Sequence, residues 1–427
     1  HRTYANLTGQ KGRIMKGNRV VVTGMGAVTP LGLDVDSSWA GICDGRSGAA
    51  MIDQFDAAAF TTRFSASVKN FSVEGYLEAR DARRMDPFIQ YGMVAGIQAF
   101  RDSGFEVTEA NAARIGCAIG SGIGGIGSIE ETAMLVDQKG PKRISPFFVP
   151  GAIINMIAGN LSILYNLQGP NIAVVTACTT GTHNIGLGAR MIAAGDVDAM
   201  LVGGAEMATT PVGIGGFAAA RALSTRNDDP ERASRPWDAD RDGFVLSEGA
   251  GILVLEELEH ARKRGANIYC EIVGFGCTAD AGHITQPDEN GTGAGKAMQL
   301  ALDDARVEAG QIDYINAHGT STPLGDKAET QAVKNVFRDH ASKLSISSTK
   351  SVIGHSLGAS GGIELISTAL AIKNNLVPPT ANLDTPDPAC DLDYTPRTPR
   401  EREIQYALSN SFGFGGHNAC VVARKFS

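Results

Sequence analysis

The chain has 427 residues, 43% of them hydrophobic and 20% charged, which is typical of globular proteins and excludes intrinsic disorder for its bulk. Its 38 basic and 46 acidic residues give a net charge of −8, which argues against a general nucleic-acid binder. No stretch of about 18 apolar residues lacks Gly, Pro or charge, so neither a transmembrane helix nor a membrane partner is predicted.

Short apolar runs that end near glycines recur along the chain and predict buried strands. In chain order they cover residues 19–23, 114–120, 198–204, 251–255, 269–274, 314–317 and 418–423. Between them, apolar residues at helical spacing predict helices over residues 87–103, 180–194, 255–265, 295–309, 327–338 and 358–374. The first helix opens with Asp86 as a suitable N-cap and Pro87 at its first position. This alternation predicts an α/β architecture.

The predicted elements fall into two similar halves, each opening with a strand and a Gly turn. We expect an N-terminal half over residues 18–265 and a C-terminal half over residues 266–427. Residues 1–17 have no apolar signal core and are interpreted as a tag or the remnant of an organelle-targeting leader. The polar stretch 224–242 predicts a long loop, and the Pro- and Asp-rich stretch 378–399 predicts irregular surface structure.

The number and spacing of the cysteines argue against a disulfide framework or a zinc site, so no metal is expected. Their count is odd, they are widely scattered and no pair has the CxxC spacing. A reducing compartment fits this pattern. The seven are Cys43, Cys117, Cys178, Cys270, Cys277, Cys390 and Cys420.

The stretch from Asn171 to Cys178 is rich in β-branched residues and leads directly into a helix of small residues. It predicts a strand that runs into Cys178, with the thiol at the N-terminus of the next helix. A helix N-terminus lowers a thiol pKa and offers free backbone N–H groups. This arrangement resembles a nucleophile elbow. A small buried core cysteine is the more common alternative, and His183, five residues later, is interpreted as a core residue.

Three further stretches place polar side chains at strand ends. His318 follows an apolar strand and precedes a Gly, although a histidine bonded within a turn would look the same. Lys350 has small and apolar neighbours, which favours a buried lysine paired with Glu364 over a solvated one. His355 comes five residues later, just before a Gly-rich helix start.

Glycines flank Phe414 in the fourth stretch, so its backbone can move and can offer an N–H to an oxyanion. A plain hairpin turn with one packed aromatic is the alternative. One cysteine, two histidines and a lysine, each at a strand end, together suggest covalent acyl transfer. The Gly-rich run 120–125 lacks the Lys-Ser/Thr ending of a phosphate loop.

The motifs around these residues are similar to those of bacterial type II β-ketoacyl-[acyl-carrier-protein] synthases. They are Val-Val-Thr-Ala-Cys-Thr-Thr-Gly at 174–181, Asn-Ala-His-Gly-Thr-Ser-Thr-Pro at 316–323, Ser-Thr-Lys-Ser-Val-Ile-Gly-His at 348–355 and Asn-Ser-Phe-Gly-Phe-Gly-Gly at 410–416. Residues 144–150, 215–226 and 234–238 match as well. The resemblance covers nearly all of residues 18–425.

The resemblance implies a thiolase-like fold with five α-β-α-β-α layers and two pseudo-symmetric halves. It implies an acyltransferase of fatty-acid biosynthesis that works as a cytoplasmic homodimer with acyl carrier protein; an organelle matrix is the lesser alternative. An acyl group moves from the carrier protein to Cys178. Malonyl carrier protein then loses CO₂, and its carbanion attacks the thioester to give 3-oxoacyl carrier protein. No cofactor is expected, because the substrates are carried on phosphopantetheine.

The resemblance also implies roles for particular residues. His318 and His355 would stabilise the enolate formed on decarboxylation, and Lys350 with Glu364 would organise charge around them. The backbone N–H groups of Cys178 and Phe414 would form the oxyanion hole, and Phe414 would gate the pocket. Residues at substrate-binding positions are Thr320, Thr322, Ile123, Phe217 and His283.

Because the carrier protein is acidic, a local basic dock is expected on this acidic enzyme. Basic residues at the matching positions are Arg80, Arg83, Arg84, Lys142, Arg143 and Arg221, although a solvated charged face is the alternative for each. Near the site, the chain departs from the family pattern at His417, Ile353 and Ser356. The family usually has Thr, Thr and Leu at these positions, in that order. Residues 281–285 also look altered.

Three other functions are weighed against this one. A coenzyme A thiolase would need a second active cysteine near the C-terminal loop, where only Cys420 lies. A condensing enzyme of a specialised pathway would share most of the motifs. A silent partner subunit typically lacks the nucleophile, so Cys178 argues against it.

Overall fold

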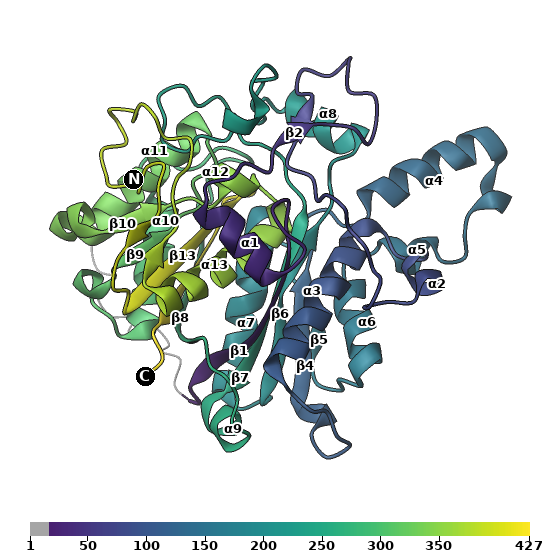
Figure 1. Cartoon of the computed structure of the whole chain (residues 1–427), viewed down its shortest axis with the longest axis horizontal. Coiled ribbons are helices and arrows are strands. Elements are labelled where there is room, and N and C mark those ends of the chain that lie inside the picture. Colours follow the sequence, from purple (N-terminus) through teal and green to yellow (C-terminus); the bar gives the residue numbers. More distant parts are fainter. Residues whose placement is uncertain (1–16) are drawn as a thin grey trace, which may run out of the picture.

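The computed structural model describes residues 17–427, and its main feature is a sheet of ten strands (Figure 1). Five strands come from the first half of the chain. From the middle of the sheet to its edge they are β1 (Val20–Val28), β7 (Gly249–Glu257), β6 (Ala199–Glu206), β4 (Ile115–Gly120) and β5 (Asn171–Ile172). Five come from the second half, and to the opposite edge they are β8 (Cys270–Ala279), β14 (His417–Arg424), β13 (Tyr406–Gly413), β9 (Tyr314–Asn316) and β10 (Ser345–Ser347).

The two sets of strands have the same order and the same directions. In each set the first three strands pair antiparallel and the last two join in parallel. The sets meet only where β1 pairs with β8, over Val20–Val22. Two halves related by a pseudo-twofold are therefore visible in the strand order itself.

Helices cover both outer faces and fill the space between the two sets of strands. The first set is covered outside by α3 (Pro87–Ser103) and α6 (Met156–Tyr165), and the second by α10 (Thr292–Ala305) and α11 (Pro323–Phe337). Between the sets lie α7 (Thr180–Ala194) and α13 (Ser360–Asn374), which contact strands of both halves. The predicted five-layered α-β-α-β-α arrangement is confirmed.

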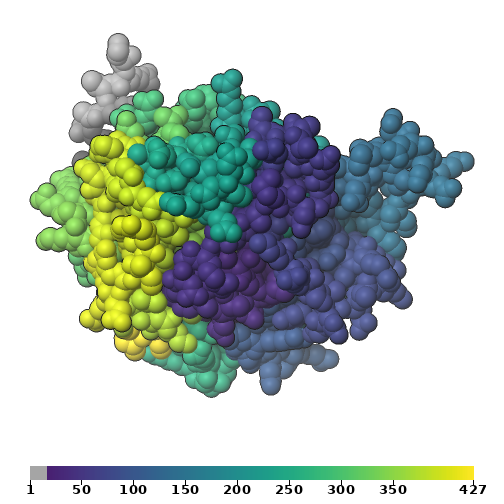
Figure 2. Space-filling view, turned by 45° about the horizontal axis from the view of Figure 1, so that its top comes forward, coloured from purple at the N-terminus to yellow at the C-terminus, as the bar shows by residue number. Residues whose placement is uncertain are grey.

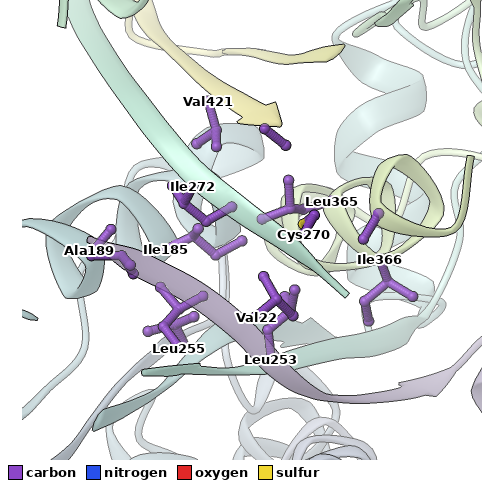
Figure 3. Packing of buried hydrophobic residues seen from close by; sticks show 14 of the residues in the cluster. Val22, Ile185, Ala189, Leu253, Leu255, Cys270, Ile272, Leu365, Ile366 and Val421 are labelled. Atoms are coloured by element: carbon purple, nitrogen blue, oxygen red, sulfur yellow. The ribbon is translucent and has the colours of Figure 1, made fainter. Parts of the chain in front are cut away.

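The central layer is held by an apolar core to which both halves contribute. Val22 of β1, Ile272 of β8, Ile185 of α7 and Leu365 of α13 all lie in it, and Figure 3 shows them converging. Each is about 1% exposed or less. Burying a side chain of this size contributes roughly 1.5–3 kcal/mol, so this core fixes α7 and α13 and hence the residues at their N-termini.

The remaining helices and strands lie around the ten-stranded sheet and the helices that cover it. The helices are α1 (Val35–Cys43), α2 (Ala79–Ala82), α4 (Ile126–Lys139), α5 (Phe148–Ala152), α8 (Pro211–Ala219), α9 (Leu258–Lys263) and α12 (Lys350–Ile353). Short strands pair as β2 (Ala50–Met51) with β3 (Phe64–Ser65) and as β11 (Leu376–Val377) with β12 (Arg400–Glu401). Helix α4 has no buried residue and projects from the body in Figures 1 and 2.

Apart from the strand predicted to run into Cys178, the predicted strands and helices match the structure to within about five residues at either end. The Asp86 carboxylate accepts from the Phe88 N–H as an N-cap, as expected. Strand β13 and helices α1, α4, α6 and α8 were not predicted, nor were the short helices α2, α5 and α12. Most of the interpretation of residues 1–17 lies outside the described residues.

Both loop predictions are confirmed, since each stretch is irregular and mixes exposed residues with buried ones. Within the stretch 224–242, the buried Arg235 pairs with Asp238 and the buried Arg241 with Asp326, so these charges neutralise each other inside the protein. In the stretch 378–399, the ring of Tyr394 stacks on Trp237 at 4.0 Å. The two stretches meet where the Asp238 carboxylate accepts from the backbone N–H groups of Asp384 and Thr385.

Candidate active site

Cys178 lies in a sharp turn between the edge strand and the central helix α7. Strand β5 ends at Ile172, so the predicted strand running into Cys178 is too long. The reason is that Asn184 of α7 takes over the pairing: its amide donates to the Val174 carbonyl and accepts from the Val174 N–H. Ala177 then has a φ of +51°, and a short 3₁₀ turn, Ala177–Thr179, leads into α7. This is the geometry of a nucleophile elbow.

The expected lowering of the thiol pKa is wrong for the protein without substrate. Burial raises the pKa of the Cys178 thiol to about 12. The Lys350 ammonium and backbone N–H groups of Phe414 and Cys178 oppose this rise but do not cancel it. The thiol is therefore protonated at neutral pH, and the acyl-transfer step has to include a proton acceptor.

His318 and His355 provide two imidazoles beside the thiol. Their ring centroids are 5.3 Å apart and the planes are nearly perpendicular, at 87°. Both side chains are buried, and burial together with the Lys350 charge holds both pKa values well below the ordinary 6.5. Both rings are therefore neutral at neutral pH, which allows each to accept or donate a proton.

The backbone around each histidine is fixed from another element. The carboxylate of Glu329, on α11, accepts from the N–H groups of His318 and Gly319, at 2.9 and 2.7 Å. The backbone of His355 bonds to Val245 and Ser247, ahead of β7. Glu329 was not predicted from the sequence, because its position one helical turn beyond Asp326 gives no signal.

Lys350 and Glu364 form the buried ion pair that the sequence suggested. Neither side chain lines the pocket. Burial raises the pKa of the Glu364 carboxyl to about 7, and the Lys350 ammonium opposes that rise. Their influence on the site is electrostatic, since Lys350 is among the causes that lower both histidine pKa values.

Phe414 occupies the turn of the hairpin formed by β13 and β14. Its backbone N–H bonds to the Cys178 sulfur, and its ring lies 6.4 Å from the ring of Phe217. The next residue, Gly415, has a φ of +88°, which favours glycine, and its N–H donates to the Ile284 carbonyl at 2.7 Å. The loop is thus both a hairpin turn and the partner of the nucleophile, so the two interpretations describe the same element.

These groups meet in one pocket of about 840 Å³, a volume that includes its open mouth. Apolar rings form one part of its wall, and the segment 285–288 with two threonine hydroxyls forms another. The site residues expected from sequence that line it are Cys178, His318, His355, Phe414, Thr320, Thr322 and Phe217. Phe244, Leu357, Phe412 and Asn418 also line it but were not expected.

Two expected pocket residues lie elsewhere in this structure. Ile123 is about one-third exposed and does not line the cavity; its N–H donates to Glu206 at 3.1 Å. His283 is exposed, and its Nδ1 accepts from the backbone N–H of Gln286 at 3.0 Å. His283 therefore shapes the 281–288 loop, whose later residues do reach the pocket.

The six expected docking residues differ in their exposure to solvent. Arg80, Arg83, Lys142, Arg143 and Arg221 are exposed. Arg84 is only partly exposed, because its guanidinium lies 4.0 Å over the Phe147 ring and 3.7 Å from Asp81. Helix α2 carries Arg80, and Lys142 and Arg143 follow the far end of α4.

The departures from the family pattern surround the catalytic groups. His417 faces away from the pocket, towards His183, with ring centroids 6.5 Å apart. His183 bonds to Thr176 and does not line the pocket, consistent with a structural residue. Ile353 is buried in a small cluster beside α13. Ser356 is buried next to His355.

Cys420 does not provide the second reactive cysteine of a thiolase. It is fully buried in β14, donates to Asn410 at 3.0 Å and does not line the pocket. Within residues 17–427, no three His, Cys, Asp or Glu side chains gather as a metal site. In the same part of the chain, no helix is long and apolar enough to cross a membrane.

The duplicated fold and this site place the chain among the thiolase-like condensing enzymes. Two family models match it: "Beta-ketoacyl synthase, N-terminal domain" over residues 17–261 and "Beta-ketoacyl synthase, C-terminal domain" over residues 269–384. The chain therefore belongs to the beta-ketoacyl synthase family, and its relatives place it with the synthase II enzymes.

Among those relatives, the 3-oxoacyl-[acyl-carrier-protein] synthase 2 of Vibrio harveyi is 56% identical over 414 residues, covering 97% of this chain and 100% of that protein. Its namesake from Coxiella burnetii is 55% identical over 408 residues, covering 96% and 99%. A beta-ketoacyl synthase structure from Burkholderia phymatum has a TM-score of 0.90 at 38% identity, covering 96% of this chain and all of that one. A type II PKS ketosynthase in complex with its acyl-carrier protein has a TM-score of 0.89 at 32% identity, with the same coverage.

Proposed function

We propose that this enzyme condenses malonyl-acyl carrier protein with an acyl group held on Cys178, and so lengthens a fatty acyl chain by two carbons. The observation that carries the proposal is the meeting, in one pocket, of a thiol bonded by a backbone N–H and two neutral imidazoles. The enzyme is a β-ketoacyl-[acyl-carrier-protein] synthase of fatty-acid elongation, as its relatives over the full chain are.

Acyl transfer comes first. A neighbouring imidazole takes the Cys178 proton as the sulfur attacks the thioester carbon of the acyl carrier protein. The developing oxyanion is bonded by the N–H groups of Cys178 and Phe414, which belong to different halves of the fold. The carbon–sulfur bond to phosphopantetheine breaks, and the departing thiolate takes the proton from the imidazole.

Decarboxylation of malonyl carrier protein follows. The bond to its carboxylate breaks, CO₂ leaves, and the electron pair moves into an enolate. His318 and His355 each donate an N–H to the enolate oxygen, which lowers the barrier because this charge exists only in and after the transition state. The hydroxyls of Thr320 and Thr322, 2.9 Å apart at the mouth, hold the phosphopantetheine arm.

Carbon–carbon bond formation completes the cycle. The enolate carbon attacks the thioester on Cys178, and the cysteine leaves as a thiolate that takes up a proton from solvent. The products are 3-oxoacyl carrier protein and the free thiol. The reaction needs no resident cofactor, because both acyl groups arrive as thioesters.

A homodimer and a cytoplasmic location belong to the same proposal. Strand β5 is an open sheet edge, and beside it Val175 is 45% exposed. Ile163 of α6 and Met134 of the projecting α4 are 78% and 56% exposed. Large exposed apolar groups of this kind mark interaction surfaces, and a second copy pairing along β5 would cover them. The seven cysteines, all free, fit a reducing compartment.

Intact-protein mass spectrometry tests the proposal directly. Incubation with a medium-chain acyl carrier protein should add the acyl mass to Cys178, and later addition of malonyl carrier protein should remove it as 3-oxoacyl product. Cys178→Ala should take up no acyl group, whereas Cys277→Ser should behave like the unaltered enzyme, because Cys277 is the exposed thiol. No acylation with any chain length would contradict the proposal.

A further inference from the structure

Two serine hydroxyls lie in line behind the ring of His355, on the side of its Nδ1 atom. The Oγ of Ser360 is 3.1 Å from Nδ1, and the Oγ of Ser356 is 3.2 Å from the Oγ of Ser360. All three side chains are 2% exposed or less. The side chains of Ser356, Ser360 and His355 therefore form a hydrogen-bonded row that is shielded from solvent.

The backbone of this row is held on several sides. The His355 N–H donates to Val245 at 2.7 Å, and the Ser356 carbonyl accepts from the Ala359 N–H at 2.9 Å. The Gly358 N–H donates to the Glu206 carboxylate at 3.0 Å. Ser360 is the first residue of α13, whose inner face packs in the central core. The distances in the row are thus set by the fold.

The direction of these bonds matters for catalysis. A neutral imidazole carries one proton, on Nδ1 or on Nε2. Nε2 has no hydrogen-bond partner among residues 17–427, and the ring lines the pocket, so Nε2 is the atom available to an enolate. It can donate only if Nδ1 is the unprotonated nitrogen, and Nδ1 is stable in that state when a hydroxyl donates to it.

Ser356 favours that direction. If its hydroxyl donates to the Oγ of Ser360, the Ser360 proton is turned towards Nδ1, and the two bonds strengthen each other. Burial and Lys350 also lower the pKa of His355, which disfavours protonation of both nitrogens. The rings of Phe244 and His318 also face the His355 ring, and neither offers Nδ1 another partner.

The second catalytic histidine is different. The Nδ1 of His318 is buried and has no hydrogen-bond partner among the described residues. No described neighbour therefore determines which of its two ring nitrogens carries the proton. The two imidazoles, alike in burial and charge, therefore differ in how firmly their tautomer is held.

We propose that Ser360, supported by Ser356, is a positioning residue that keeps the proton of His355 on Nε2, so that His355 acts as a fixed donor to the enolate. His318, which no hydroxyl holds, is then the imidazole free to accept the thiol proton. The inference rests on the proposed condensation for its catalytic meaning, but the tautomer itself can be measured without turnover.

Ser360→Ala is the central variant, with Ser367→Ala as its matched control. Ser367 lies on the same helix, is equally buried, and its hydroxyl donates only to the Ile363 carbonyl. In Ser360→Ala we expect kcat for malonyl carrier protein decarboxylation to fall about tenfold, as for loss of an outer partner of a functional imidazole. The rate of Cys178 acylation, read by mass, should stay unchanged. Ser360→Thr keeps the hydroxyl and should restore most of the rate.

Nitrogen-15 NMR of histidine-labelled protein gives the direct readout, with the His355 signals assigned by their loss in His355→Gln. The unaltered protein should show an unprotonated Nδ1 and a protonated Nε2, and Ser360→Ala should shift Nδ1 or mix the tautomers. Ser356→Ala, which removes only the outer hydroxyl, should give a smaller change in the same direction.

A protonated Nδ1 in the unaltered protein would overturn the inference, as would equal decarboxylation rates in Ser360→Ala and Ser367→Ala. Equal losses in acylation and decarboxylation would assign Ser360 a merely structural role and also overturn it. If the unaltered enzyme failed to condense, the proposed function would fall, while the NMR result would still decide the tautomer.

Discussion

Lys350 and Glu364 form an ion pair whose two side chains are 1% and 0% exposed. Lys350 begins the short helix α12, and Glu364 lies on the central helix α13. A charge pair closed to solvent is stable only as a pair, because each partner would pay a large desolvation cost alone. The pair therefore ties the Lys350–His355 segment to the core of the molecule.

Removing one partner should be far more damaging than removing both. We expect Glu364→Gln to lower the free energy of unfolding by about 3–5 kcal/mol, because it leaves Lys350 charged and buried. The double variant Lys350→Met/Glu364→Leu should lose less than the sum of the two single variants. Urea unfolding at one fixed protein concentration measures this; additive losses would contradict the pairing.

The hairpin turn and the elbow should tolerate no extra atom between them. A Cβ at Gly413 would lie 3.1 Å from the Thr176 carbonyl oxygen and 3.2 Å from the Cys178 nitrogen. Gly413→Ala should therefore displace the Phe414 N–H and slow acylation of Cys178 by about 100-fold, the effect of losing one oxyanion-hole donor. Gly216→Ala is the control, since nothing lies within 4 Å of its Cβ. An unchanged acylation rate in Gly413→Ala would remove Phe414 from the oxyanion hole.

The rate of acyl transfer should not fall as the pH is lowered through 6.5, the ordinary pKa of histidine. Burial and Lys350 hold the pKa values of His318 and His355 well below 6.5, so both rings stay neutral, and able to accept a proton, at pH values below 6.5. On lowering the pH, kcat/KM for the acyl donor should fall only well under that value. A profile measured between about pH 5 and 8 checks this. A limb at 6.5 or above that vanishes in His318→Asn would show that the ring is not shielded.

Carrier-protein docking should depend on the exposed basic residues of α2 and its end. Reversing the charge in Arg80→Glu/Arg83→Glu should raise KM for carrier-protein substrates about tenfold at low salt and weaken the salt dependence, because charges at the rim of an interface mainly steer association. A small pantetheine thioester should react as before. Arg262→Glu/Lys263→Glu, on α9 at the lower edge of the molecule in Figure 1 and away from α2, changes the net charge equally and is the control. Equal effects of both changes would mean that α2 is not the dock.

The sequence was most informative where local pattern and chemistry coincide. The helix over Pro87–Ser103 was predicted to the residue, because its cap, its first proline and its apolar spacing are all local. Cys178, His318, Lys350 and His355 were singled out because each follows a strand and precedes small residues. The partner of Lys350 was also found, because Glu364 is close in sequence and the surrounding residues are apolar.

Other features were not predicted from the sequence, because they depend on contacts between residues that are distant along the chain. Glu329 and Ser360 look like ordinary helix residues until the fold brings them to His318 and His355. The buried ion pair of Arg241 and Asp326 was also not predicted, because the two residues meet only in the folded chain. The thiol pKa went in the opposite direction to the local expectation, because burial outweighs a helix end.

The sequence by itself determined the architecture and the catalytic side chains. The reason is that the periodicity of strands and helices, and the residues at strand ends, are local properties of the chain. Only the tertiary structure decided how those side chains work. It brings a hairpin from the second half against a cysteine from the first, and it closes two histidines and an ion pair away from water. Burial sets protonation states, and buried hydrogen bonds set directions; both arise from residues that are neighbours in space rather than in sequence.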